Sequence, residues 1–392
     1  MSKFFNSLFG FVFFCLLSFS LARAQSFGIS DRAQVSLITG SPGADLYALF
    51  GHSAIRVYDP ATGIDLLYNY GTFDFDTKHF YLKFAQRRLD YFLSISNYQQ
   101  FVSFYAGHNR SVYEQVLYLN PEQTQALYAF LQNNYLPQNR NYLYDFFYDN
   151  CSSRIRDVFK QVFKEDIQFS QERDQDKKTF RNLIDPYQHD PWVQLGLYLL
   201  LGTPTDQVAS AEDYMFLPDY LMEAFDKAKI RQGGQFIPLV SEKKTVFQAI
   251  VSKPKQGIFT PYWVFWLFFA FMAGLTYLEY RRNTRFRIVD FILFSVVGWV
   301  GILFGLMWIG TDHLQVAWNL NMLWALPTHA GFALFTWKKN PSLWMKRYCT
   351  VTSVILGLTL LAWYILPQQL HPALIPLMLV LLGRSLLIMK GN

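Results

Sequence analysis

Cysteine is scarce in this sequence, with three residues in a chain of 392. Cys15 lies in the N-terminal apolar segment and Cys349 lies in a C-terminal apolar run, which leaves Cys151 alone in the polar middle of the chain. A single cysteine cannot form an internal disulfide. In an exported domain, a leftover cysteine is either an intermolecular bridge or a reactive thiol.

Other familiar chemical signatures are also missing. No second cysteine lies near Cys151, and His79, His108 and His189 are too far apart in the sequence for the ligand spacing of a zinc site. The chain has no glycine-rich phosphate-binding loop and no Gly-x-Ser-x-Gly nucleophile elbow. We therefore expect no metal and no nucleotide cofactor.

The middle of the chain also lacks net positive charge. The whole sequence has a formal charge of +6, but residues 258–392 carry ten Lys and Arg against three Asp and Glu. Residues 25–257 carry 23 basic and 26 acidic side chains. The basicity therefore belongs to the apolar C-terminal part, and the sequence gives no support for nucleic-acid binding.

The first 24 residues have the pattern of a secretory signal peptide. Lys3 gives a positive start, an apolar stretch covers residues 11–21, and the sequence ARA at 22–24 supplies small residues for cleavage. We expect cleavage after Ala24, with an uncleaved signal anchor as the alternative. Residues 25–257 then form an exported domain.

Residues 258–392 are expected to form a transmembrane domain of about five helices. Five apolar runs there approach the ~20 residues that cross a bilayer as a helix. The third is the weakest, because Pro327 and His329 lie inside it. The runs cover residues 259–279, 288–309, 321–337, 350–366 and 372–389.

The loops between these runs alternate in charge. Four arginines at 281–287 follow the first run and four Lys or Arg residues at 338–347 follow the third, whereas loops 310–320 and 367–371 have neither. By the positive-inside rule the basic loops are cytoplasmic. The exported domain is then outside, in agreement with the signal peptide, which predicts an inner (cytoplasmic) membrane protein with a periplasmic N-terminal domain.

The exported domain has a mixed α and β pattern. Segments 35–39, 53–58, 64–70 and 110–119 predict strands, and Asn120 followed by proline predicts the start of a helix. Apolar residues at helical spacing predict another helix that begins at Cys151. Either Asp149 or Asn150 is expected to cap it. These patterns predict an α+β domain.

Cys151 and His52 form the candidate catalytic pair. A helix start favours a thiolate, because unpaired N–H groups and the helix dipole stabilise negative charge. His52 opens the strand at 53–58 and supplies an imidazole. A cysteine acyl-transfer site needs both groups and a third polar group that orients the imidazole. The alternative is a buried, inert thiol.

Several motifs resemble the family of membrane proteins with an Lnb-type N-terminal periplasmic domain. They are GHSAIRV at 51–57, YNYGTFD at 68–74, DNCSSRIRD at 149–157, FLP at 216–218, and TDH at 311–313 with Asn319 and Asn321 after it. The resemblance covers nearly the whole mature chain. It implies lipoprotein N-acylation, the transfer of an acyl chain to the α-amine of a lipoprotein's N-terminal cysteine.

The order of histidine before cysteine also resembles circularly permuted papain-like enzymes such as lecithin:retinol acyltransferase. Those enzymes transfer acyl chains from phospholipids through a cysteine thioester, and they share the Asn-Cys pair found at 150–151. This second resemblance implies a permuted papain-like (NlpC/lecithin:retinol acyltransferase-like) α+β exported domain, followed by a multi-span α-helical membrane bundle.

The third catalytic member departs from the pattern of the retinol-type enzymes. The retinol-type enzymes use a second histidine on the neighbouring strand, but segment 64–70 has none. Asn69 is the best substitute, with Asp65 and Tyr70 behind it. An asparagine can orient an imidazole by accepting a hydrogen bond from its N–H, as in papain-like triads.

Four further residues are expected to contact substrate or lipid headgroups. Asn150 and Arg154 flank the thiol, and Asp312 and His313 lie in the loop at the outer membrane edge. Polar groups at that depth are also tolerated without a special purpose, which is the alternative for the last two.

Together with the candidate pair, the two resemblances imply a thiol-dependent lipoprotein N-acyltransferase with Cys151, His52 and Asn69 as its catalytic unit. Its expected partners are phospholipid and lipoprotein substrates, with a phospholipid or a diacylated lipoprotein as the acyl donor. One alternative is a membrane-anchored cysteine hydrolase, a phospholipase or cell-wall peptidase, with water as acceptor. Another is a non-catalytic membrane assembly protein.

Overall fold

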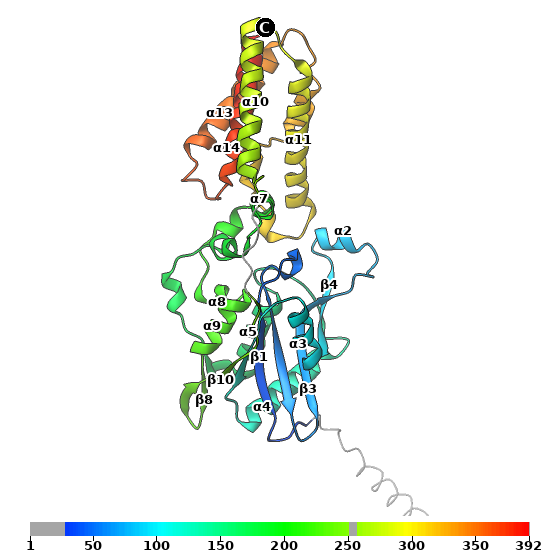
Figure 1. Cartoon of the computed structure of the whole chain (residues 1–392), viewed down its shortest axis with the longest axis vertical. Coiled ribbons are helices and arrows are strands. Elements are labelled where there is room, and N and C mark those ends of the chain that lie inside the picture. The colour runs from blue at the N-terminus through cyan, green and yellow to red at the C-terminus, as the bar shows by residue number, and fades with distance from the viewer. Residues whose placement is uncertain (1–27, 251–256, 392) are drawn as a thin grey trace, which may run out of the picture.

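The computed structural model describes residues 28–250 and 257–391, which form two stacked parts (Figure 1). A sheet-rich N-terminal domain lies at one end and a helical bundle at the other. The expected signal peptide, its cleavage site after Ala24, and Cys15 lie outside the described residues.

Seven strands form one antiparallel sheet in the order β10-β5-β1-β2-β3-β4-β6. The segments predicted as strands at 35–39, 53–58, 64–70 and 110–119 are β1, β2, β3 and β5. The bounds are β1 Gln34–Gly40, β2 His52–Asp59, β3 Ile64–Phe73, β4 Asp90–Asn97, β5 Val112–Leu117, β6 Asn141–Leu143 and β10 Val240–Phe247. A small second sheet contains β7 Ile167–Gln168, β8 Lys229–Gln232 and β9 Gln235–Pro238.

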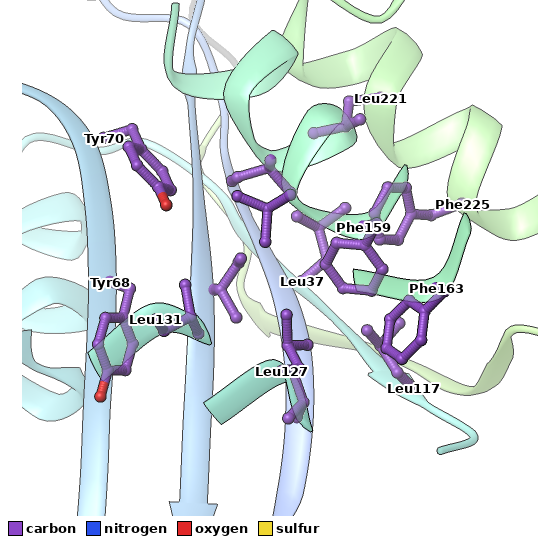
Figure 2. Close-up of a cluster of buried hydrophobic side chains, with 14 of the residues drawn as sticks. Leu37, Tyr68, Tyr70, Leu117, Leu127, Leu131, Phe159, Phe163, Leu221 and Phe225 are labelled. Carbon is purple, nitrogen blue, oxygen red and sulfur yellow. The ribbon is translucent and has the colours of Figure 1, made fainter. Parts of the chain in front are cut away.

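Both faces of the large sheet are covered, because successive side chains of a strand point to opposite sides. On one face, Leu37 and Tyr68 pack against Leu127, Phe159 and other residues of α4 (Pro121–Tyr135), α5 (Cys151–Phe163) and α9 (Pro218–Lys227) (Figure 2). On the other face, α3 (Tyr98–Gly107) packs over a smaller cluster. The helix predicted after Asn120 is α4, and Asn120 caps it.

Shorter helices connect these elements. They are η1 Leu46–Ala48, α2 Phe80–Ala85, η2 Lys164–Asp166, η3 Glu172–Gln175, α6 Phe180–Ile184, η4 Asp185–Tyr187, α7 Pro191–Leu200, η5 Thr203–Asp206 and α8 Ala211–Tyr214.

Three helices in the described part of the chain are long and apolar enough to cross a membrane. They cover Pro261–Arg282, Arg287–Gly310 and Pro372–Lys390, which are the first, second and fifth predicted runs. The bundle elements are α10 Pro261–Arg282, α11 Arg287–Gly310, η6 Leu314–Val316, η7 Leu320–Leu323, α12 Thr328–Ala333, α13 Leu343–Leu361, η8 Pro372–Leu374 and α14 Ile375–Lys390. The helix α13 covers most of the fourth run, but Lys346 and Arg347 near its start lower its mean hydropathy.

The third predicted run differs from the expectation of one spanning helix. It contains the short η7 and then α12, whose six residues extend only about 9 Å against a hydrocarbon core of about 30 Å. The broken segment packs tightly on α11: a Cβ at Gly298 would lie 2.1 Å from the Ala330 nitrogen, and one at Gly301 would lie 2.0 Å from the Ala325 oxygen. The two glycines therefore let irregular backbone lie inside the bundle, where protein surrounds it.

Both basic loops lie at the end of the bundle that is remote from the sheet domain. Arg285 donates to the Thr336 carbonyl, and Arg287 Nη1 donates to the Trp337 carbonyl at 2.6 Å. Nearby, Arg384 pairs with Glu279 and, at 2.7 Å, with Asp290, so buried charges join α10, α11 and α14. The positive charges thus gather on one side of the bundle, as the predicted orientation requires.

The opposite end of the bundle is bonded to the sheet domain through the last turn of α7. Asn319 Nδ2 donates to the Leu199 carbonyl at 2.7 Å, and Gln368 Nε2 donates to the Leu201 carbonyl at 3.0 Å. The last carbonyls of a helix have no partner within it, so the bundle loops satisfy them. Gly202 comes next, and a Cβ there would lie 1.9 Å from the Ala317 oxygen. The two parts are therefore joined closely.

We predict the topology directly from this arrangement. A reporter fused after Arg282 or Lys339 should behave as cytoplasmic, and one fused near His313 as external, because the positive charges stay inside. Paired alkaline phosphatase and green fluorescent protein fusions at each position measure this. An external signal at Lys339 would contradict the five-run topology and remove one crossing.

Candidate functional site

His52 lies at one end of the large sheet, whose strands run lengthwise toward the bundle in Figure 1. It is the first residue of β2 and pairs with Gly40, the last residue of β1. Gly51, directly before it, has φ +83°, a left-handed conformation that favours glycine, and a Cβ there would lie 2.7 Å from the Gly40 oxygen. The glycine of the GHS motif thus allows the tight turn that delivers His52.

Cys151 is the first residue of α5, which packs against β2 and β3. Asn150 caps the helix: its Oδ1 accepts from the Ser152 and Ser153 amides at 2.8 and 2.9 Å. Ser153 Oγ in turn accepts from the Asn150 amide at 2.8 Å, which completes a capping box. Asn150 is therefore the cap, of the two residues that the sequence proposed.

Cys151 and His52 shift each other's pKa. Burial alone raises the pKa of the Cys151 thiol, but attraction to His52 and hydrogen bonds from His52, Ser53 N–H and Ser152 outweigh it, so the pKa is lowered. For His52, burial lowers the pKa, while attraction and hydrogen bonding to Cys151 and a bond with Asn69 raise it above its ordinary value. The shifts in opposite directions favour a thiolate–imidazolium pair.

Asn69 is placed to orient the imidazole. Its Oδ1 lies 3.2 Å from His52 Nε2, while its Nδ2 donates to Ser96 Oγ at 2.9 Å and to the Leu67 carbonyl at 3.2 Å. The amide is thus held with its oxygen toward the ring. If His52 Nε2–H donates to Asn69, the other ring nitrogen is left to exchange a proton with the thiol.

The two alternatives to Asn69 are engaged elsewhere. Asp65 pairs with Arg56 at 2.7 Å, and the Tyr70 hydroxyl donates to Asn134 Oδ1 at 2.5 Å. Tyr70 is followed by Gly71, where φ is +86° and the β3–β4 register shifts. A Cβ at Gly71 would lie 3.6 Å from the Cys151 Cβ, so this bulge brings strand backbone beside the thiol.

The expected substrate contacts have other partners. Asn150 is buried, and its Nδ2 donates to the Phe146 and Phe216 carbonyls, so its side chain is committed to the protein rather than to a ligand. Arg154 forms an ion pair with Asp149 at 2.6 Å and borders a polar cavity of ≈ 610 Å³.

Asp312 and His313, the two residues of the outer loop that were expected to contact substrate or headgroups, contact the sheet domain instead. Asp312 pairs with Arg88 at 2.8 Å, and its amide donates to the Gln86 carbonyl at 3.1 Å. His313 Nε2 lies 3.3 Å from the Phe84 carbonyl. These contacts hold the region around α2 against the loop that follows α11.

Sequence reasoning missed two residues beside the site. Tyr144 lies next to Gly71, and burial raises its pKa well above the usual range, so it presents a neutral phenol near the thiol. Asp145 accepts from Gln315 Nε2 at 2.7 Å and pairs with Arg87 at 2.9 Å. Asp145 thereby links the segment before Cys151 to the bundle. Neither residue belongs to a spacing pattern that points to chemistry.

Within residues 28–250 and 257–391, no group of three or more His, Cys, Asp or Glu side chains is placed to hold a metal ion. Both cysteines in those ranges, Cys151 and Cys349, are free. The candidate site therefore consists of a thiol, an imidazole and an amide.

Comparison with known proteins gives two family matches that together cover most of the chain. The model described as Lnb N-terminal periplasmic domain matches residues 24–186, and the model described as Lnb transmembrane domain matches residues 253–391. Neither the curated proteins nor the solved structures gave a match. The first match includes His52, Asn69 and Cys151.

We predict that the reactivity of Cys151 depends on His52. In full-length protein with Cys349→Ser, pH-dependent alkylation should report a thiolate below the usual thiol range. His52→Ala should move the labelling curve upward by about 1–2 pH units, because the cation that lowers the thiol pKa is lost. His189→Ala, at an exposed histidine, is the control and should leave the curve in place. An unchanged curve for His52→Ala would show that the two groups are not partners.

Proposed function

The chain belongs to the Lnb family of membrane proteins, and from this premise we propose that it is a lipoprotein N-acyltransferase. One observation carries the proposal: a Cys151–His52–Asn69 unit that favours a thiolate lies just after Asp145, to which Gln315 of the membrane bundle donates a hydrogen bond. A reactive thiol this close to the membrane bundle can reach lipid esters and membrane-anchored lipoproteins.

In this proposal, residues 1–24 are the signal peptide, 25–257 the catalytic domain and 258–392 a transmembrane domain of about five helices in the inner membrane. The catalytic domain has a permuted papain-like fold. Support comes from a cysteine at a helix start that packs against an antiparallel sheet, with its histidine on the adjoining strand β2. Strand β10 completes the sheet beside β5, so residues after the first family match belong to the same domain.

The first half-reaction forms an acyl-enzyme. The Cys151 thiolate attacks the carbonyl carbon of a lipid ester, a carbon–sulfur bond forms, and the ester carbon–oxygen bond breaks. The His52 imidazolium gives its proton to the departing alcohol. The Cys151 amide lies in the first turn of α5 and is not used by the Asn150 cap, so it is available to stabilise the oxyanion.

The second half-reaction transfers the acyl group to nitrogen. The α-amine of the lipoprotein's terminal cysteine attacks the thioester, a carbon–nitrogen bond forms, and the carbon–sulfur bond breaks to restore the thiolate. His52 takes the proton from the amine. The sum is ester plus amine giving amide plus alcohol, so the reaction is balanced without another reactant.

Water competes with the amine for the same thioester, and this competition separates the acyltransferase from a hydrolase. Tyr144 lies near the thiol, and its ring contacts Tyr91, which in turn contacts Phe73. An apolar surround disfavours bulk water at the thioester. We therefore favour transfer over hydrolysis.

We predict an order of damage among three variants. Cys151→Ser should abolish transfer because a hydroxyl rarely ionises near neutral pH, and His52→Ala should lower the rate by about 10²-fold or more. Asn69→Ala removes one orienting hydrogen bond, which is worth about 1 kcal/mol, so a loss of about fivefold to tenfold is expected. Asn69→Asp keeps the acceptor and should restore most of the rate.

The measurement is transfer of acyl chains from phospholipid to a diacylated lipopeptide, normalised to folded protein, with released fatty acid recorded in parallel. Exposed His189→Ala again serves as the control. Full normalised transfer by Cys151→Ser would end the thioester mechanism. Fatty acid release without amide formation would instead assign the chain to the hydrolases.

A further inference from the structure

The helix α2 carries an apolar surface that the protein leaves uncovered. Phe75, Tyr81, Leu82 and Phe84 are 68%, 83%, 57% and 52% exposed, and none of the residues of α2 is buried. We name these four residues the α2 patch. Large apolar groups gathered on the surface of an exported domain mark a contact with another apolar phase.

The height of the α2 patch follows from its contacts with the bundle. The apolar helix α11 ends at Gly310, and two residues later the Asp312 amide donates to the Gln86 carbonyl, directly after α2. Arg88 and His313 add an ion pair and a polar contact between the same segments. The patch therefore lies where a membrane-crossing helix leaves the lipid.

The apolar surface continues from the patch onto α11. The outward side chains Leu303, Leu306 and Ile309 are 55%, 61% and 85% exposed along the final turns of that helix. Such residues face hydrocarbon in a membrane helix. Because the α2 patch adjoins the same helix end, lipid is the partner that fits it.

A row of aromatic rings connects the α2 patch to the thiol. Ring centroids of Phe75 and Phe80 lie 5.0 Å apart, those of Phe80 and Phe73 5.8 Å, and those of Phe73 and Tyr91 5.3 Å. Tyr91 then stacks on Tyr144 at 4.5 Å. Tyr144 lies beside Gly71, whose added Cβ would be 3.6 Å from both Tyr144 and the Cys151 Cβ.

We propose that the α2 patch is inserted in the outer lipid leaflet and that the aromatic row leads the acyl chain of a membrane lipid from it to Cys151. This inference rests on the proposed function, since it names the surface that loads the same thiol. Aromatic side chains are favoured at the boundary between headgroups and hydrocarbon, and their faces offer the apolar contact that an acyl chain needs outside the bilayer.

The insertion can be tested without any measure of activity. The photoreactive residue p-benzoylphenylalanine, placed at position 81 of the full-length chain in native membranes, should form lipid adducts on irradiation. The matched control is position 118, because Tyr118 is 54% exposed and follows β5 at the end of the sheet opposite to His52. Phospholipid adducts at 81 and not at 118 are expected. Equal lipid labelling at both positions, or none at 81, would overturn the proposal.

The loading role is tested by thioester formation on Cys151. Tyr81→Asp with Phe84→Asp should slow acylation from membrane phospholipid by about tenfold or more, because carboxylates are costly at this depth. Acylation by a water-soluble short-chain ester should be unchanged, because that donor does not need the patch. Tyr118→Asp should affect neither donor.

The two donors separate failure of this inference from failure of the proposed function. Undiminished acylation of the double variant by phospholipid would overturn the loading role while leaving the acyltransferase intact. Absence of a thioester on Cys151 with either donor in the unaltered chain would instead defeat the proposed function. If the double variant does not fold, the milder change Tyr81→Ser replaces it. This variant should be acylated more slowly than the unaltered chain by phospholipid, with a smaller loss than the double variant, and at the unaltered rate by the soluble ester. Acylation at the unaltered rate by both donors would overturn the proposal.

Discussion

The Asn150 cap is the interaction on which the rest of the site depends. One amide side chain accepts from two N–H groups of α5 and donates to the carbonyls of Phe146 and Phe216, so it joins the helix, the segment before it and the segment that leads into α9. Losing it would leave several buried polar groups without partners, each costing about 1–3 kcal/mol. It also fixes Cys151 at the helix start, against Ser53 and His52 of β2.

The bundle sets the height of this site relative to the membrane. Its outer loops satisfy the last carbonyls of α7, bond to the backbone after α2, and reach Asp145 through Gln315. These contacts fix the position of the segment that carries Cys151 relative to the bundle. The thiol is therefore held at a constant depth relative to the membrane. Under the proposed function this arrangement suits lipid substrates, because they arrive at a single depth.

Much of this arrangement could be predicted from the sequence. The features that could not be predicted depend on packing between distant segments. The strands β1, β2, β3 and β5 and the start of α5 followed from periodicity and cap chemistry, with Asp149 and Asn150 both open as the cap. Asn69 was proposed from the resemblance to the retinol-type enzymes, and its catalytic role stays a prediction. The third apolar run, expected as the weakest of the five, contains η7 and α12 instead of one long helix, because its close packing on Gly298 and Gly301 supports irregular backbone that composition alone does not reveal.

Hydrogen-bond partners that are distant in the chain could not be predicted from the sequence either. Asn150 was expected as a possible cap and substrate contact, but its bond to the Phe216 carbonyl, 66 positions away in the chain, has no local sequence signal. The roles of Asp312 and Tyr144 likewise appear only when separate segments meet around α2 and Gly71. Local signals suggested candidates for reactive residues, whereas tertiary contacts decide which of them face one another.

The central claim is that Cys151 carries the acyl group, and mass spectrometry of that residue tests it most directly. The full-length protein, isolated from membranes after acid quenching and digested, should yield a Cys151 peptide with the added mass of a fatty acyl chain. Hydroxylamine should remove that mass, because a thioester is cleaved and an amide is not. An unmodified Cys151 peptide in cells whose lipoproteins acquire their N-acyl chain through this protein would contradict the account.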